Sequence, residues 1–492
     1  MTADAWTGSG DGSQGAIRSD GRLLRGLIIA VGIGWAVLFM VVGLGYGLQM
    51  YGDGSMFSYS VAVENAWAFH WHNISGRLFT FLVTLLPAEI YVELTKDARG
   101  GITVYGLLFF AAPLLGLLAT FAADRSKGRI IFSYACLSTA CLCPLVFGFP
   151  TEMWMAHSLF WPTLALCHYG RGGIARGALV FPMLLALVLT HEAALLLAAA
   201  IVATLALRGW RNGALLRALG AFLAAIAIWG LVKVAIPPDD YFGGMFVRAA
   251  LGFFDIAILG SNVLLLLIGA ITAYGIALFV FSRLAPQQAP VCAAALVALA
   301  LAVYWLWFDH SLHADHRYYM RTVVFIATPV FGAFAAMHAL WADGELHVRF
   351  ARLWPWAPAV SAASRVAVGA LVLVTLVHAV ETAKFVEAWS AYKSAVRALA
   401  TGAASDPALG DPRFVSASRI GPSLNRLSWN STTLYLSALL APAFAPARLV
   451  IDPSGNYFWL ACETAKANEE AERPVPVETR RLARVHACLH RP

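Results

Sequence analysis

The sequence predicts an all-α polytopic membrane protein with about eleven transmembrane helices, followed by a small mixed α/β domain. Two observations support this fold class. Of the 492 residues, 60% are hydrophobic and only 13% are charged, whereas soluble domains carry about 25% charged residues. Several apolar runs also exceed the ~18 residues typical of a transmembrane helix. In such a chain the net charge of +7 reports loop orientation and does not indicate nucleic-acid binding.

The order of the elements follows from the apolar runs and the charges between them. Residues 1–25 are polar and rich in Gly and Ser, which predicts a disordered cytoplasmic tail. We expect membrane spans over 26–48, 102–123, 130–148, 153–169, 178–190, 192–207, 218–236, 256–281, 290–308, 322–341 and 366–386. With a cytoplasmic N-terminus, the cytoplasmic segments hold fifteen Lys and Arg, and the opposite loops before the tail hold six. This asymmetry satisfies the positive-inside rule and makes the loop 49–101 extracytoplasmic.

The segment 78–94 is long enough for a short span. Counting it as one would invert every later loop and place the basic stretch after residue 123 outside. We therefore interpret it as an interfacial amphipathic helix that breaks near Pro87. Its Glu89 and Glu93 are four residues apart and share one helical face.

The tail, residues 387–492, is richer in Pro, Asn, Asp, Ser and charge than the apolar region 26–386. About a hundred residues suffice for a small domain, so we expect a separate extracytoplasmic C-terminal domain. The run RLVIDP predicts a short strand in it. Cys462 and Cys488 lie in this tail, where a disulfide and two free thiols are both open interpretations.

Polar residues that could carry chemistry gather in the loops on the extracytoplasmic side. Asp53 stands between Gly52 and Gly54, shortly after the first span, and glycines allow close approach of the backbone to a ligand. A carboxylate there could act as a general base toward a hydroxyl, or it could simply cap the next helix. Arg77 could hold a phosphate oxygen in a bidentate manner.

Two further acidic positions sit at expected helix ends. Glu152 begins an apolar helix, where the helix dipole favours a carboxylate. His191 and Glu192 interrupt an otherwise uncharged run over 178–207. As one helix this run would be ~45 Å long, against a bilayer core of ~30 Å. Two short helices that meet at His191 and Glu192 fit better, and ionisable residues at such a place favour a functional site.

Cations lie on the same side. Arg317 and Arg321 are four apart at the start of a span, so they share a face and could clamp a lipid phosphate or diphosphate together with His316. A solvated positive patch at the lipid head groups is the alternative. The neighbouring His and Asp residues could bind a metal, although their spacing matches no strict pattern: His310, His313, Asp315 and His316. Lys233, near the end of a span, could snorkel to the surface or contact a phosphate.

The arrangement GDGSMFSY…WAFHWHNISGRLF, with an acidic outward loop after the first span and a "GR" before an amphipathic stretch, resembles the GT-C superfamily. These are polytopic glycosyltransferases that use lipid-linked sugars, and the layout is most similar to the bacterial branch that includes serotype-converting glucosyltransferases. The resemblance implies an inverting transfer of a sugar from a polyprenyl-phosphate donor to a glycan or glycolipid acceptor. It implies a bacterial inner-membrane location, with the C-terminal domain in the periplasm.

The resemblance also implies roles for the residues above. Asp53 would be the base, and Glu152, His191 and Glu192 would hold sugar hydroxyls or orient the base. The donor phosphate would be bound by residues from several loops: Arg77, Lys233, His316, Arg317 and Arg321. A divalent metal, Mg²⁺ or Mn²⁺, stays open as a cofactor. The expected partners are the donor, the acceptor and membrane lipid, without nucleic acid.

Two other functions remain open. An O-antigen polymerase or ligase would use undecaprenyl-diphosphate glycans on the same side, although its long late Arg-rich loop is not apparent here. A lipid or polysaccharide transporter would show repeated halves with matching broken helices, and we find one broken span and no repeat. No phosphate-binding Gly-Lys-Ser loop occurs, which disfavours ATP-driven transport by this chain alone.

Overall fold

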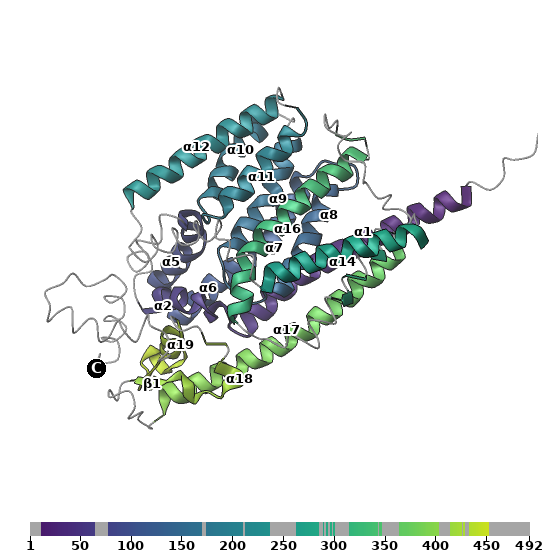
Figure 1. Cartoon of the computed structure of the whole chain (residues 1–492). Helices are drawn as coiled ribbons and strands as arrows, with labels where there is room; N and C mark the ends of the chain where they lie inside the picture. The colour runs from purple at the N-terminus through teal and green to yellow at the C-terminus, as the bar shows by residue number, and fades with distance from the viewer. Residues whose placement is uncertain are drawn as a thin grey trace, which may run out of the picture.

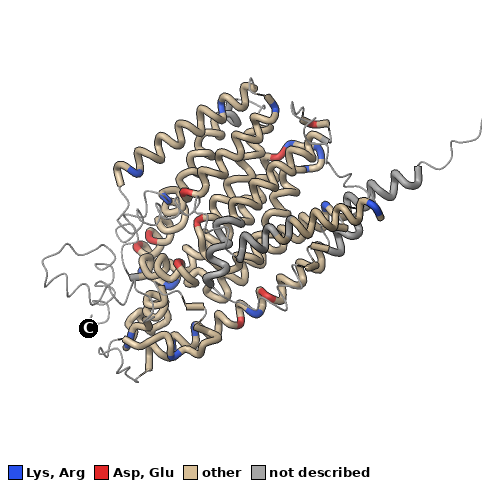
Figure 2. Tube along the Cα trace, viewed as in Figure 1, with Lys and Arg blue, Asp and Glu red and all other residues tan. Residues whose placement is uncertain are grey.

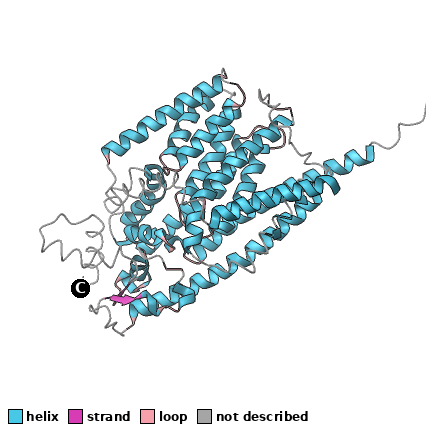
Figure 3. Cartoon of the chain, in the orientation of Figure 1, coloured by secondary structure: helices cyan, strands magenta, loops and turns pink. Residues whose placement is uncertain are grey.

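The computed structural model describes a chain that is almost entirely helical (Figure 1, Figure 3). The described residues are 11–63, 77–169, 174–209, 212–236, 262–284, 314–342, 344–346, 364–402, 414–425, 427–428 and 432–451, with a few isolated positions between 289 and 300. Within these ranges four helices are long and apolar enough to cross a membrane, and several shorter apolar helices accompany them. The chain is a multi-pass helical membrane protein.

The helices of the membrane region follow one another with short connections. Their bounds are α1 Asp11–Gly45, α2 Asp53–Val63, α5 Leu86–Thr95, α6 Ala98–Phe110, α7 Ala112–Ala123, α8 Ile130–Leu145, α9 Met153–Tyr169, α10 Ile174–Val188, α11 Ala194–Ala206, α12 Gly213–Ala235, α14 Asn262–Leu284, α16 Ala314–Ala342 and α17 Ser364–Thr401. The spans expected between 26 and 236 each coincide with a helix or, for 102–123, with the pair α6 and α7. α1 begins at Asp11, inside the stretch whose composition predicts disorder. The total number of spans stays a prediction, because most of 290–308 lies outside the described residues.

Contacts between helices fix their directions. A Cβ on Gly106 of α6 would touch the side chain of Gln49, just after α1. At the other end of the same helices, Arg25 Nη1 donates a hydrogen bond to Gly128 O at 3.0 Å. α1 and the α6–α7 pair therefore run antiparallel.

The later helices continue this alternation. α9 and α11 run side by side in the same direction, because His168 Nε2 lies 3.1 Å from Thr204 Oγ1 near the ends of both helices. α10 lies between them in sequence and returns the chain, so that Leu189 O, just past its end, accepts a hydrogen bond from Phe79 N. We call the end where α2, α9 and α11 begin the site end, and the end near Arg25 and Gly128 the opposite end.

The segment that was expected to break near Pro87 is a continuous helix, so the expected break is wrong. Residues Arg77–Thr95 form one helix. Phe81–Leu85 adopt a π-helical turn, and α5 follows directly with Pro87 in its first turn. Proline cannot donate the hydrogen bond that an α-helix needs at an interior position. The π turn rearranges the hydrogen bonds just before Pro87, so the helix continues instead of breaking.

Both ends of this helix lie at the site end of the bundle. Its first residue, Arg77, pairs with Glu152 at the start of α9. Near its other end, Val92 packs against Gly101, in the first turns of α6. A Cβ added at Gly101 would lie 2.2 Å from Val92 Cγ2. The helix is apolar and long enough to cross a membrane, so its contribution to the number of spans stays a prediction. Its interfacial position stays a prediction.

The C-terminal part packs directly on the first loop. α17 continues without interruption past residue 387, the expected domain boundary, to Thr401. The strands β1 Phe414–Ser416 and β2 Leu449–Ile451 pair in parallel, and β2 confirms the expected strand. With them lie the short helices α18 Pro422–Asn425 and α19 Thr433–Leu440.

A second hydrophobic cluster joins this C-terminal part to the bundle. Tyr435 of α19 packs against Tyr59 of α2, with ring centroids 5.3 Å apart. Ser55 Oγ of α2 also donates a hydrogen bond to Thr432 O at 2.9 Å. The division into separate domains stays a prediction, and Cys462 and Cys488 lie outside the described residues.

Candidate functional site

Asp53 is the first residue of α2, at the site end. The glycines beside it serve close packing within the protein. Gly52 has a positive φ of 56°, and a Cβ there would lie 2.7 Å from the Phe149 ring. A Cβ on Gly54 would lie 2.3 Å from Gln49 O. Asp53 is half-buried. The helix start expected for this residue is confirmed, and the close approach that the glycines allow is to the chain's own residues.

A cluster of aromatic rings supports the turn before Asp53. The ring of Tyr51 packs edge-on against Phe149, Phe385 and Trp389, with centroids 5.6, 5.2 and 5.2 Å away. Trp389 Nε1 and Lys393 Nζ, both on α17, donate hydrogen bonds to Tyr46 O. The start of α2 is therefore held between the turn before α9 and the C-terminal half of α17.

Arg77 and Glu152 form the closest ion pair of the site. Arg77 Nη1 lies 2.6 Å from Glu152 Oε1, and the Glu152 side chain is 7% exposed. Glu152 directly precedes α9, where the positive end of the helix dipole also stabilises its charge. Two of the predicted site residues, from segments 75 residues apart, thus meet in a nearly buried contact.

Glu192 and Lys233 form a second pair beside the first. The chain turns between α10 and α11, as the length of the run 178–207 predicts, and this turn holds His191 and Glu192. Lys233 Nζ, in the last turn of α12, donates to Glu192 Oε1 at 2.8 Å. His191 Nδ1 lies 3.8 Å from Glu192 Oε2 and accepts a hydrogen bond from Ala193 N at 3.0 Å.

The charges around Glu192 keep it ionised. Burial alone would raise the pKa of its carboxyl. The charges of His191, Arg77 and Lys233 and the hydrogen bond from Lys233 outweigh burial and lower the pKa to about 2. The effect of Arg77 on Glu192 shows that the two ion pairs lie within electrostatic reach of one another. A carboxylate with so low a pKa is a weak proton acceptor.

Tyr105 is a further buried residue near Asp53 and Glu152. It was not predicted as a site residue from the sequence. Its side chain is 1% exposed, and its hydroxyl has no hydrogen-bond partner among the described residues. The hydroxyl interacts electrostatically with both Glu152 and Asp53. In the sequence Tyr105 is one aromatic residue in an apolar run, which usually means packing. The available signal is that a buried tyrosine hydroxyl normally has a partner.

The remaining predicted residues are only partly placed. Arg317, Arg321 and His316 lie in the first turns of α16, which begins at Ala314, so the expected helix is confirmed. Their side chains, like His310 and His313, lie outside the described residues. Within the described ranges, no group of three His, Cys, Asp or Glu side chains could hold a metal ion.

Several acidic residues lie around α2, α5 and the neighbouring helix ends, and others lie along α17 and at the opposite end (Figure 2). The site combines three carboxylates, each at or just before the start of a helix, with two cations in direct contact with two of them. Glu152 and Glu192 each accept a hydrogen bond from a cation, and Asp53 lies with Glu152 within electrostatic reach of Tyr105.

Comparisons with known proteins add little. No family model matches the chain, and no curated protein matches its sequence. A solved structure of the oligosaccharyltransferase of Archaeoglobus fulgidus, tethered through a disulfide to an acceptor peptide containing the NVT sequon, is similar over 86% of this chain with 12% identity. The TM-score is 0.31, and the match spans 64% of the length of that protein. A similarity of this size does not establish a shared function.

Proposed function

We propose that this protein is a GT-C-like membrane glycosyltransferase that moves a sugar from a polyprenyl-phosphate donor to a glycan or glycolipid acceptor, on the extracytoplasmic side and with inversion at the sugar carbon. The observation that supports this most is the meeting of Asp53, Arg77, Glu152, His191, Glu192 and Lys233 at one end of the bundle. Charged groups close to a membrane are costly, so their gathering at one place favours a functional site.

Asp53 would act as the general base. The acceptor hydroxyl would give its proton to the Asp53 carboxylate while its oxygen attacks the sugar carbon, and the bond from that carbon to the phosphate oxygen would break. Glu152 and Glu192 each accept a hydrogen bond from a cation. Their role would be to orient Arg77 and Lys233 and to bind sugar hydroxyls together with His191.

Arg77 and Lys233 would stabilise the phosphate that leaves. Both cations lie in contact with a carboxylate, so a donor phosphate would bind by sharing or displacing these partners. Negative charge grows on the phosphate as the glycosidic bond breaks, and fixed cations stabilise that charge most in a site with little water. Arg317, Arg321 and His316 would add to this phosphate site from the start of α16.

The described residues do not fit a divalent metal. Glu152 and Glu192 are engaged by Arg77 and Lys233, and no group of three potential ligands occurs within the described part of the chain. The mechanism therefore routes no step through Mg²⁺ or Mn²⁺. The C-terminal part, which packs on α2, would help to bind the acceptor.

The test is sugar transfer by the purified full chain from a panel of radiolabelled polyprenyl-phosphate sugars to a membrane glycolipid extract. Asp53→Asn should lower the rate by about 10²–10⁴-fold, the range for loss of a general base. Asp97→Asn is the matched control, because Asp97 is an exposed helix-start aspartate that accepts a hydrogen bond from Gly100 N. It should transfer at the wild-type rate.

The outcomes separate the candidate functions. Wild-type rates in Asp53→Asn would overturn the base assignment. Transfer only from diphosphate-linked donors would favour the polymerase or ligase. Movement of labelled lipid across a bilayer without sugar transfer would favour the transporter.

A further inference from the structure

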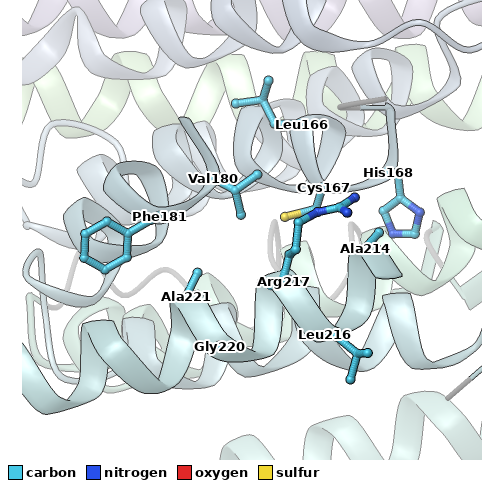
Figure 4. Close-up of a pocket in the computed structure, with 11 residues that line it drawn as sticks. Leu166, Cys167, His168, Val180, Phe181, Ala214, Leu216, Arg217, Gly220 and Ala221 are labelled. Carbon is cyan, nitrogen blue, oxygen red and sulfur yellow. The ribbon is translucent and has the colours of Figure 1, made fainter. Parts of the chain in front are cut away.

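A crevice lies away from the candidate site, near the opposite end of the bundle. It has a volume of about 280 Å³ and lies between the end of α9, the middle of α10 and the first half of α12. Figure 4 shows Arg217 rising from α12 toward Cys167 and His168 of α9, with Val180 and Phe181 of α10 on the other side. Nearly all the other side chains that line it are apolar or small.

Small residues on α12 create the crevice. Ala214, Ala218, Gly220 and Ala221 face it, where larger side chains would close the gap to α10. A Cβ added at Gly220 would meet no atom within 4 Å, so the space beside this glycine is open. α12 also exposes Leu216, at the edge of the crevice, and Leu223, by 59% and 57%. An exposed apolar face of this kind is expected where a helix touches lipid, so the crevice opens toward acyl chains.

The charge in the crevice is positive. No ion pair between Arg217 and a described carboxylate is present. Arg208, just past α11, donates from Nη1 to His168 O at 3.1 Å and brings a second guanidinium to the same helix ends. Arg217 also lies near the start of α12, where the helix dipole is positive. These features together favour an anion with an apolar body.

We propose that this crevice binds an anionic phospholipid of the surrounding membrane. Its phosphate would contact Arg217, and the upper part of one acyl chain would lie against Val180, Phe181 and the small residues of α12. Basic pockets between transmembrane helices are known to bind anionic head groups. The site is independent of the proposed transfer reaction, because it lies at the other end of α9 and α12 from Glu152 and Lys233.

The test is native mass spectrometry of the purified full chain with phosphatidylglycerol or phosphatidylcholine of identical acyl chains. We expect the wild type to retain phosphatidylglycerol at least tenfold better. Arg217→Gln should lose this preference. Gly220→Phe should reduce the binding of phosphatidylglycerol by a similar factor, because the ring would fill the open space while Arg217 stays in place.

Two control variants match these changes. Arg283→Gln removes an exposed cation near the end of α14, and Gly230→Phe adds the same ring to α12 at a glycine that also has no atom within 4 Å of its Cβ position. Both should bind lipid as the wild type does. Equal retention of the two lipids by the wild type would overturn the proposal. So would wild-type binding of phosphatidylglycerol by Arg217→Gln or Gly220→Phe. An equal rise in unfolding temperature with soluble glycerol phosphate and with phosphatidylglycerol would also overturn it.

Discussion

The two ion pairs of the candidate site and two arginines at the opposite end differ in their partners. At the site end, Arg77 contacts Glu152 and Lys233 contacts Glu192, so side chains pair with side chains. At the opposite end, Arg25 and Arg208 donate to the backbone carbonyls of Gly128 and His168.

Asp124 completes the contrast at the opposite end. It is fully buried there and accepts hydrogen bonds from the backbone N–H groups of Ser126 and Phe132, at 2.8 and 2.9 Å.

This difference distinguishes charged side chains that stabilise the fold from charged side chains that could bind a ligand. Backbone groups at helix ends always need a partner, so a side chain that caps them has a fixed task. An ion pair between two side chains can open when a ligand supplies a replacement charge. The two pairs at the site end are therefore the groups that a phosphate could engage, whereas Asp124 and Arg25 hold loops.

Removing Arg77 should give the largest effect. Arg77→Gln leaves Glu152 nearly buried without its cation, which should lower the free energy of unfolding by about 3 kcal/mol. The double variant Arg77→Gln/Glu152→Gln should regain most of this stability but still transfer sugar slowly, because the phosphate contact is gone. Thermal unfolding in detergent and transfer rates measure both.

Asp124→Asn is the comparison for the opposite end. It should also destabilise the protein, by about 1–3 kcal/mol, because one buried backbone N–H would lose a good acceptor. The rate per folded molecule should stay unchanged. A rate loss in Asp124→Asn, or full activity in the double variant, would break the distinction between the two ends.

The pH dependence of stability gives the next effect. The folded-state pKa of Glu192 is lowered from 4.5 to about 2. The carboxyl therefore contributes stability above pH 4.5, and this contribution is lost as the pH falls toward about 2. The full contribution is at most about 3 kcal/mol at 1.36 kcal/mol per pKa unit. Unfolding temperatures between pH 2 and 6 should fall more steeply for the wild type than for Glu192→Gln. Parallel curves would contradict the ion pair with Lys233.

The smallest change in stability is expected at Tyr105. Tyr105→Phe removes a buried hydroxyl that has no partner among the described residues, so the unfolding temperature should stay the same or rise slightly. If the hydroxyl donates to substrate, the transfer rate should fall by roughly 2–10-fold, the value of one net hydrogen bond. An unchanged rate would assign Tyr105 to packing. Phe109→Leu, one turn away, serves as the control for altered packing.

The sequence could predict the position of the site because membranes restrict both length and charge. The run 178–207 is too long for one crossing, so the turn at His191 and Glu192 was predictable. The loops that carry Asp53 and Glu152 follow from the alternation of helices. The π turn before Pro87 was not predictable, because a proline shows that a hydrogen bond is missing but not how the helix compensates.

The pairing within the site could not be predicted. Arg77 meets Glu152 and Lys233 meets Glu192 because helices distant in sequence lie side by side, and no local pattern encodes these distances. Sequence reasoning assigned both cations to a phosphate and did not foresee their carboxylate partners. The extension of α17 to Thr401 was missed for another reason. Its last turns carry charged side chains, so their composition is that of a polar tail although they form a helix.

The path of α17 also limits how this protein can be divided. Trp389 and Lys393 hold the carbonyl of Tyr46, and Phe385 and Trp389 support the ring of Tyr51, two residues before Asp53. A chain cut after residue 386, or one that exchanged its tail with another protein there, would lose three of these four contacts at the first loop. An exchange of the tail that keeps these contacts would therefore have to preserve α17 through residue 401.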